Sequence, residues 1–104
     1  MSVGSAGEEI AARFFTERGI DVLGRNIHTG HREIDLIVRI DGAPVVVEVK
    51  TGVGEGTRPW ERFDQDKEHR MRRAAHSVGI GRVDLVTVEF TREVVIVRWS
   101  PRIG

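Results

Sequence analysis

The pair Asp41-Gly42 constrains the fold more than any other feature of the sequence. Apolar residues alternate with other residues before the pair, over Arg32–Ile40, and again after it, over Ala43–Lys50. Asp-Gly between two alternating runs is a strong signal for a β-hairpin with a two-residue turn. The sequence therefore predicts an antiparallel hairpin in which Ile40 pairs with Ala43.

Counting outward from that turn gives the two faces of the hairpin, because side chains alternate along a strand. One face is apolar throughout and is expected in the core; it consists of Ile34, Leu36, Val38, Ile40, Ala43, Val45, Val47 and Val49. The other face is apolar only at its middle, at Ile37 and Val46, which predicts partial cover by a helix. On this second face we expect Asp35 opposite Glu48, two residues before Lys50 on the same strand.

Two carboxylates in that position need an explanation. Like charges directly opposite each other destabilise a strand pair by a few tenths to about 1 kcal/mol, and partial burial adds to the cost. A divalent cation between Asp35 and Glu48 would offset it, since Mg²⁺ binds carboxylate oxygens. Lys50 could then orient the attacking water and offset charge on a phosphate. The alternative is an ordinary charged surface, in which Glu33 pairs with Lys50 and an arginine, Arg25 or Arg39, neutralises Asp35.

Helices and further strands flank the hairpin. We expect helices over Ser5–Arg18 and Glu61–Val78, and strands over Ile20–Ile27, Val83–Phe90 and Glu93–Trp99. The order α-β-β-β-α-β-β predicts a single α/β domain over residues 1–104, with a mixed central sheet flanked by helices. Trp99 is expected in the core or at a contact between two copies of the chain.

Composition limits the classes of protein that fit. Lys and Arg together number 16, as do Asp and Glu, so any contact with nucleic acid must come from a local patch. The absence of Cys excludes disulfide scaffolds, thiol catalysis and cysteine-based zinc sites, and it fits a reducing compartment. No apolar run approaches the ~20 residues of a membrane span, and the first residues do not read as a signal peptide. We therefore expect a cytoplasmic protein with no membrane partner.

A local excess of positive charge occurs in and after the second helix, at Lys67, Arg70, Arg72, Arg73 and Arg82. Lys67, Arg70 and Arg73 fall roughly on one side of a helix, where they could contact phosphates. A solvated helix face is the alternative, because acidic residues precede the cluster. The Gly-rich segment 51–60 carries Arg58 and Trp60, which could touch a nucleic-acid strand; a plain linker is the alternative there.

Several of these residues occur together in a known family. Segments 7–15, 33–37 and 47–51, with Lys67 and Arg82-Val83-Asp84, follow the order and spacing of the YraN-like family (UPF0102), which the chain resembles over nearly its whole length. That family belongs to the PD-(D/E)XK nuclease superfamily and is related to archaeal Holliday-junction resolvases. The resemblance implies a restriction-endonuclease-like fold and an endonuclease that hydrolyses DNA, branched or damaged, with Mg²⁺ or Mn²⁺.

The resemblance also assigns roles by position. It gives Lys50 the place of the catalytic lysine and assigns the metal ion to Glu8, Asp35, Glu48 and the backbone carbonyl of Val49. Glu8 has an alternative role in capping its helix together with Ser5. The chain has Arg32 where the family has Gly, and Gly52 where the family has a basic residue, which removes one phosphate contact.

Three functions stay open on the sequence alone. The first is the metal-dependent DNA nuclease, which could act as a homodimer, as small nucleases of this fold often do. The second is a catalytically inactive module of the same fold that binds nucleic acid. The third is an interaction domain that dimerises through its terminal strands and does not bind DNA.

Overall fold

The structure is a computed structural model that describes residues 2–30, 32–62 and 64–104. Its elements follow the expected order, with one short 3-10 helix added before the second α-helix. They are α1 (Val3–Glu17), β1 (Val22–Thr29), β2 (Arg32–Ile40), β3 (Ala43–Val53), η1 (Pro59–Arg62), α2 (Gln65–Ser77), β4 (Val83–Phe90) and β5 (Val95–Ser100). No helix in these ranges is both long and apolar enough to cross a membrane.

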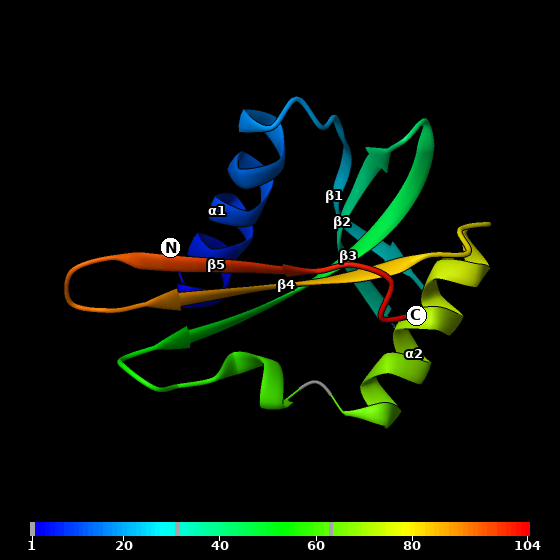
Figure 1. Ribbon diagram of the computed structural model, residues 1–104. Coiled ribbons are helices and arrows are strands. Elements are labelled where there is room, and N and C mark those ends of the chain that lie inside the picture. The colour runs from blue at the N-terminus through cyan, green and yellow to red at the C-terminus, as the bar shows by residue number, and fades with distance from the viewer. Residues whose placement is uncertain (1, 31, 63) are drawn as a thin grey trace.

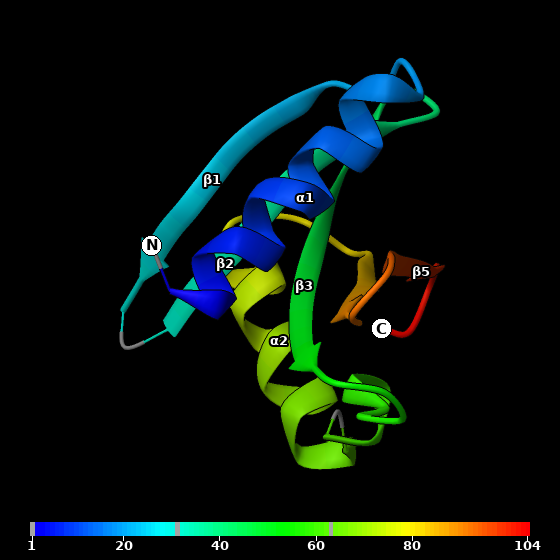
Figure 2. The ribbon, with the colours of Figure 1, turned by 90° about the vertical axis from the view of Figure 1, so that its left-hand side faces the viewer.

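The strands form one mixed sheet in the order β1-β2-β3-β4-β5. Neighbouring strands are antiparallel except β3 and β4, which are parallel. A parallel pair needs a crossover connection, and residues 54–82, which include α2, supply it on one face of the sheet. Helix α1 covers the other face (Figures 1 and 2). The expected α/β architecture, a mixed sheet flanked by helices, is therefore confirmed.

Each face of the sheet carries its own apolar cluster. On the α1 side, Ala11 and Phe15 are fully buried against residues such as Leu36. On the α2 side, the buried residues Met71 and Ala75 pack in a cluster that also holds Ile34, Val46 and Val83. The expected cover over the middle of the second hairpin face is thus provided by α2. Trp99 joins the α1 cluster, where its ring meets the rings of Phe14 and Phe15 edge to face.

The helix starts differ from those expected. Helix α1 is capped by Ser2, whose Oγ accepts a hydrogen bond of 3.0 Å from the Ser5 backbone N–H. The predicted cap at Ser5 and the capping role of Glu8 are therefore wrong. Helix α2 begins at Gln65, four residues later than predicted, because the Asp64 side chain accepts from the Lys67 backbone N–H at 3.0 Å and caps it. Phe63, which the predicted helix included, lies outside the described residues.

The predicted hairpin register is confirmed near the turn. Asp41 and Gly42 both have positive φ, 51° and 80°, as a two-residue hairpin turn requires. The pairs run from Ile40–Ala43 to Leu36–Val47, and in the described ranges the ladder ends there. The directly opposed pairs expected beyond Leu36 are not formed.

The regular alternation of β2 is broken at Asp35. Ile34 packs on the α2 side, whereas Leu36, two residues later, packs on the α1 side. The expected placement of Ile34 beside Leu36 is therefore wrong. On β1, Asn26 lies between the partners of Leu36 and Ile34 and has a φ of 51°, which interrupts the β1–β2 ladder at this level. The side chains of β2 therefore switch from one face of the sheet to the other at Asp35.

Candidate metal and nucleic-acid site

Three carboxyl groups from three elements approach one another where the β2–β3 ladder ends. Asp35 lies on β2, Glu48 on β3 and Glu8 on α1. The Asp35 Oδ2 accepts a hydrogen bond of 2.8 Å from the Val49 backbone N–H. Glu8 and Glu48 both lie close enough to Asp35 to affect its pKa. The structure therefore brings together the three acidic residues that the sequence singled out, although Asp35 bonds to the backbone of β3 instead of facing Glu48 in a regular pair.

The acidity of these groups reflects their crowding. Burial, and next the charge of Glu48, raise the pKa of Asp35 to about 7, against the opposing effect of the Val49 N–H bond. Burial also raises the pKa of Glu8, and the charges of Asp35 and Glu33 add to this effect. Asp35 is thus only partly ionised at neutral pH, because burial and the neighbouring charge of Glu48 disfavour its charged form.

Lys50 lies beside these carboxyl groups. Its Nζ forms an ion pair of 3.0 Å with Glu48 Oε1, and both side chains are largely buried, at 25% and 12% exposure. The alternative pairing of Lys50 with Glu33 is not formed among the described residues. The arginines of that alternative bind elsewhere: Arg25 pairs with Glu9 at 2.8 Å and Arg39 with Asp21 at 3.4 Å. The pairs of an ordinary charged hairpin surface are therefore absent from the described ranges.

Two adjoining hollows, each of about 250 Å³, open beside this cluster and share Lys50 and Lys67. We call them together the carboxylate cleft. The hollow next to α1 is lined by Val3, Gly4, Glu8, Val49, Lys50, Thr51 and Lys67. The hollow next to α2 is lined by Arg32, Glu33, Glu48, Lys50, Lys67, Arg70 and Met71. Two of the basic residues predicted to contact nucleic acid, Lys67 and Arg70, therefore border the carboxyl groups.

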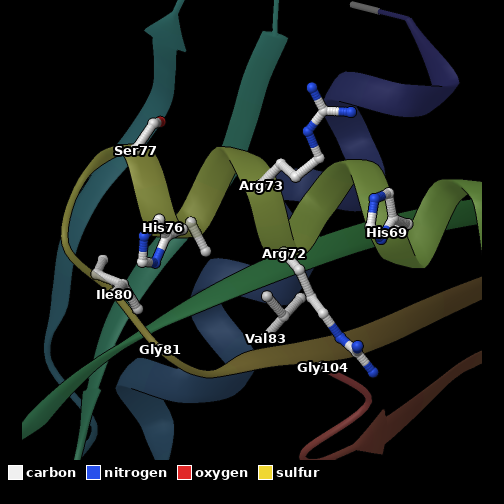
Figure 3. Close-up of a pocket in the computed structure, with 10 residues that line it drawn as sticks. His69, Arg72, Arg73, His76, Ser77, Ile80, Gly81, Val83 and Gly104 are labelled. Carbon is white, nitrogen blue, oxygen red and sulfur yellow. The ribbon is translucent and has the colours of Figure 1, made fainter.

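The other predicted nucleic-acid contacts lie elsewhere. Arg73 lines a larger cavity of about 530 Å³ on α2, together with His69, Arg72 and His76 (Figure 3). In that view Arg72 and Arg73 point to opposite sides of the helix. Arg58 is exposed and pairs with Glu61 at 3.2 Å. Neither Arg58 nor Arg73 is among the residues that line the carboxylate cleft.

Arg82, also expected in the basic cluster, has a structural partner. Asp84 is fully buried and accepts hydrogen bonds from Arg82 Nε at 2.9 Å and Arg82 Nη2 at 3.0 Å. The same carboxylate accepts from Trp99 Nε1 and from the Arg102 backbone N–H, both at 2.8 Å. These bonds fix the segment after β5 against β4, so the Arg82-Val83-Asp84 motif serves the fold here.

Asn26 borders the carboxyl groups, although it was not among the site residues predicted from the sequence. With its amide nitrogen turned towards the carboxylates, it donates to Glu33 Oε1 at 3.1 Å and to Glu8 Oε2 at 3.2 Å. Its positive φ is a conformation that Asn adopts more readily than most residues. An Asn inside an otherwise extended run was the available signal.

Glu8 reaches the site because α1 packs closely on the end of β3. The preceding residue is the buried Gly7, and a Cβ placed there would lie 2.1 Å from Thr51 Oγ1. Only a glycine permits this approach without a shift of one element.

The donor chemistry of the cluster fits a hard divalent cation. Carboxylate and carbonyl oxygens suit Mg²⁺ and Mn²⁺, and a cation would stabilise the ionised forms of Asp35 and Glu8, which burial and neighbouring negative charge now disfavour. Within residues 2–30, 32–62 and 64–104, however, no three His, Cys, Asp or Glu side chains are already grouped to hold an ion. Glu48 instead forms an ion pair with Lys50. The residue types therefore suit a divalent cation, although their side chains bond to other protein groups in this structure.

Comparison with known proteins gives one consistent family. The profile described as "Uncharacterised protein family UPF0102" matches residues 7–88. UPF0102 proteins of Rhodococcus opacus and Nocardia farcinica are 40% identical over 95 residues and 42% identical over 77 residues. These matches cover 89% and 72% of this chain but 70% and 60% of the relatives. A UPF0102 protein of Thermotoga neapolitana is 37% identical over 89 residues, which are 84% of this chain and 82% of that protein. The chain thus spans between 60% and 82% of the length of these three relatives.

Proposed function

The chain belongs to the UPF0102 family, and from its site we propose that it is a metal-dependent DNA endonuclease with a restriction-endonuclease-like fold. The observation that carries the proposal is the convergence of Glu8, Asp35 and Glu48 beside Lys50, at the point where two strands of the sheet separate. Buried acidic groups with perturbed pKa values in a cleft are typical of functional sites.

The residues that would hold Mg²⁺ or Mn²⁺ are Glu8, Asp35, Glu48 and the backbone carbonyl of Val49. A bound ion of this kind supplies a Lewis acid for the phosphate and lowers the pKa of water. The raised pKa values of Asp35 and Glu8 support the assignment, because a cation would stabilise the ionised carboxylates that burial and neighbouring negative charge now disfavour. Asn26 would hold Glu8 in position through its amide.

Lys50 would act on the water and the phosphate. Its ammonium group already lies 3.0 Å from a carboxylate that would bind the ion, so it would face the reacting phosphate as well. There its N–H groups would orient the attacking water and offset the charge that develops on the phosphate oxygens. The Lys50 side chain is three-quarters buried, which limits screening of its charge by solvent.

DNA would bind across the cleft through the basic residues on its α2 side, Lys67 and Arg70. Such contacts are independent of sequence and weaken with salt, which favours recognition of DNA structure, such as a branch or damage, over recognition of bases. A homodimer would present two clefts for cuts in two strands. The cysteine-free sequence supports a cytoplasmic location.

The test combines metal binding with cleavage. Mn²⁺ titration should show binding by the wild-type protein that Glu48→Ala abolishes, while Glu61→Ala, an exposed acid away from the cleft, leaves it intact. Flap, junction, nicked and single-stranded DNA should be offered with Mg²⁺ and with Mn²⁺. We expect cleavage of at least one substrate by the wild type, and loss of cleavage in Lys50→Ala with metal binding retained.

Two outcomes would overturn the proposal. DNA binding that survives Asp35→Ala and Glu48→Ala, with no cleavage under either metal, would establish an inactive nucleic-acid-binding module. No DNA binding at low salt would leave the interaction domain as the remaining function.

A further inference from the structure

We infer that Arg32 and Arg70 form a clamp for the phosphate that neighbours the scissile one, so that the bound DNA strand runs along the α2 side of the carboxylate cleft. The inference rests on the proposed function and adds to it a positioning residue, Arg32, and a direction for the strand. It concerns binding, so it can be tested without cleavage.

The first support is convergence. Arg32 is the first residue of β2 and Arg70 lies in the middle of α2, far apart in the sequence. Both line the same hollow of about 250 Å³, together with Glu48 and Lys50. Two guanidinium groups from separate elements therefore border the place where the proposed reaction occurs.

The second support is uncompensated charge. In the described part of the chain, the side chains of Arg32 and Arg70 form no hydrogen bond and no ion pair. The charges of Arg70 and Asp64 interact, but Asp64 is exposed and forms no ion pair with Arg70. Six arginines that do not line the cleft are bound to carboxylates, namely Arg25, Arg39, Arg58, Arg72, Arg82 and Arg98. The two guanidinium groups at the cleft are thus available for an external anion.

The third support is the chemistry of the group. A guanidinium presents N–H donors in a fixed fork that matches two phosphate oxygens, which a lysine does not. The hollow is smaller than the roughly 300 Å³ at which small-molecule pockets begin, so it suits one phosphate of a longer chain better than a free ligand. Glu33 and Glu48 line the same hollow and would repel the phosphate. The phosphate would therefore lie beside the two arginines.

The positive charge lies mainly on the α2 side of the carboxylate cleft, and this determines the path of the bound DNA strand. The α1 hollow is lined by Val3, Gly4 and Glu8, and its two cations, Lys50 and Lys67, are those it shares with the α2 hollow. Phosphates beyond the cleft on the α1 side would meet Glu8 and no further lining cation. The strand therefore extends from the carboxyl groups over Arg70 and Arg32.

The test is the salt dependence of DNA binding in EDTA, measured by fluorescence anisotropy with labelled single-stranded and duplex DNA. Arg32→Ala and Arg70→Ala should each weaken binding about tenfold at low salt, since a bond between charged groups is lost. Each should also reduce the slope of log K against log salt by about 0.7 for single strands or about 0.9 for duplex. Arg72→Ala is the matched control, because it removes the same charge from the same helix but lines the separate cavity of Figure 3. Its slope should equal that of the wild type.

The Lys substitutions separate geometry from charge. Arg32→Lys and Arg70→Lys should restore the salt slope but only part of the affinity, because the bidentate fork is lost. Wild-type slopes in Arg32→Ala and Arg70→Ala, or an equal loss in Arg72→Ala, would overturn the inference even if the wild type cleaves DNA. The expected slopes in a protein that cleaves nothing with any metal would support the clamp and overturn the proposed nuclease.

Discussion

Asp35→Asn should make the metal-free protein more stable at alkaline pH. The substitution keeps an acceptor oxygen for the Val49 N–H, which now bonds to Asp35 Oδ2 at 2.8 Å. It also supplies an amide that can donate to the neighbouring Glu8 and Glu48 carboxylates. What it removes is a negative charge in a partly buried site, which costs stability whenever Asp35 is ionised.

The magnitude follows from the pKa of Asp35, which the fold raises from its ordinary 3.8 to about 7. Between these values the folded state keeps a proton that the unfolded state has lost, so wild-type stability falls as pH rises. At about 1.4 kcal/mol per pH unit, the loss reaches roughly 4 kcal/mol above pH 7 and then stops growing. Below pH 4 both states are protonated and the loss vanishes.

The assay is urea denaturation of wild type and Asp35→Asn at pH 4 and pH 8.5 in EDTA. We expect Asp35→Asn to gain about 2–4 kcal/mol over the wild type at pH 8.5 relative to pH 4. Asp21→Asn, at an exposed carboxylate, is the control and should show no such gain. An Asp35→Asn protein with the same advantage or deficit at both pH values would show that Asp35 is not held protonated by its surroundings.

Two further predictions concern the frame around the site. Asp84→Ala should destabilise the protein by about 3–5 kcal/mol in urea denaturation, because it strands the Arg82 guanidinium and the Trp99 and Arg102 N–H groups; a loss under 1 kcal/mol would contradict this role. Gly7→Ala should cost about 1–3 kcal/mol through its clash with Thr51, whereas Gly4→Ala, on the same helix with only Ser2 Oγ at 3.9 Å, should be neutral or stabilising; equal thermal midpoints for the two variants would contradict the close approach.

The hairpin shows how far sequence reasoning reaches. The Asp41-Gly42 turn and the alternation around it predicted the register of the β2–β3 pair, and the structure confirms it up to Leu36 and Val47. The prediction failed where the ladder ends, since period-two counting assumes that a strand stays regular. At the same level Asn26, which has a positive φ, interrupts the ladder between β1 and β2, and the pairing of β1 with β2 could not be predicted from the hairpin itself.

Part of the candidate site could be predicted from the sequence, but its contacts could not. Asp35, Glu48 and Lys50 were chosen because of an expected cross-strand pair, and they do lie together, although by a different arrangement. Asn26 and Arg32 reach the site through strand β1 and the first residue of β2. Their roles depend on how these elements meet α1 and α2, and no local pattern in the sequence specifies that.

The parallel pairing of β3 with β4 has a consequence for the order of folding. It joins residues 46–53 to residues 83–90, so a long stretch of chain must be closed into a loop before those strands gain their contacts. The β2–β3 hairpin, closed by a tight turn, can form without that delay. Helix α2, which supplies Lys67 and Arg70, lies within this loop. In a partly folded chain the acidic residues of the hairpin would therefore lack the basic side of the cleft, where we propose that DNA binds. The proposed binding of DNA would thus require the completed sheet.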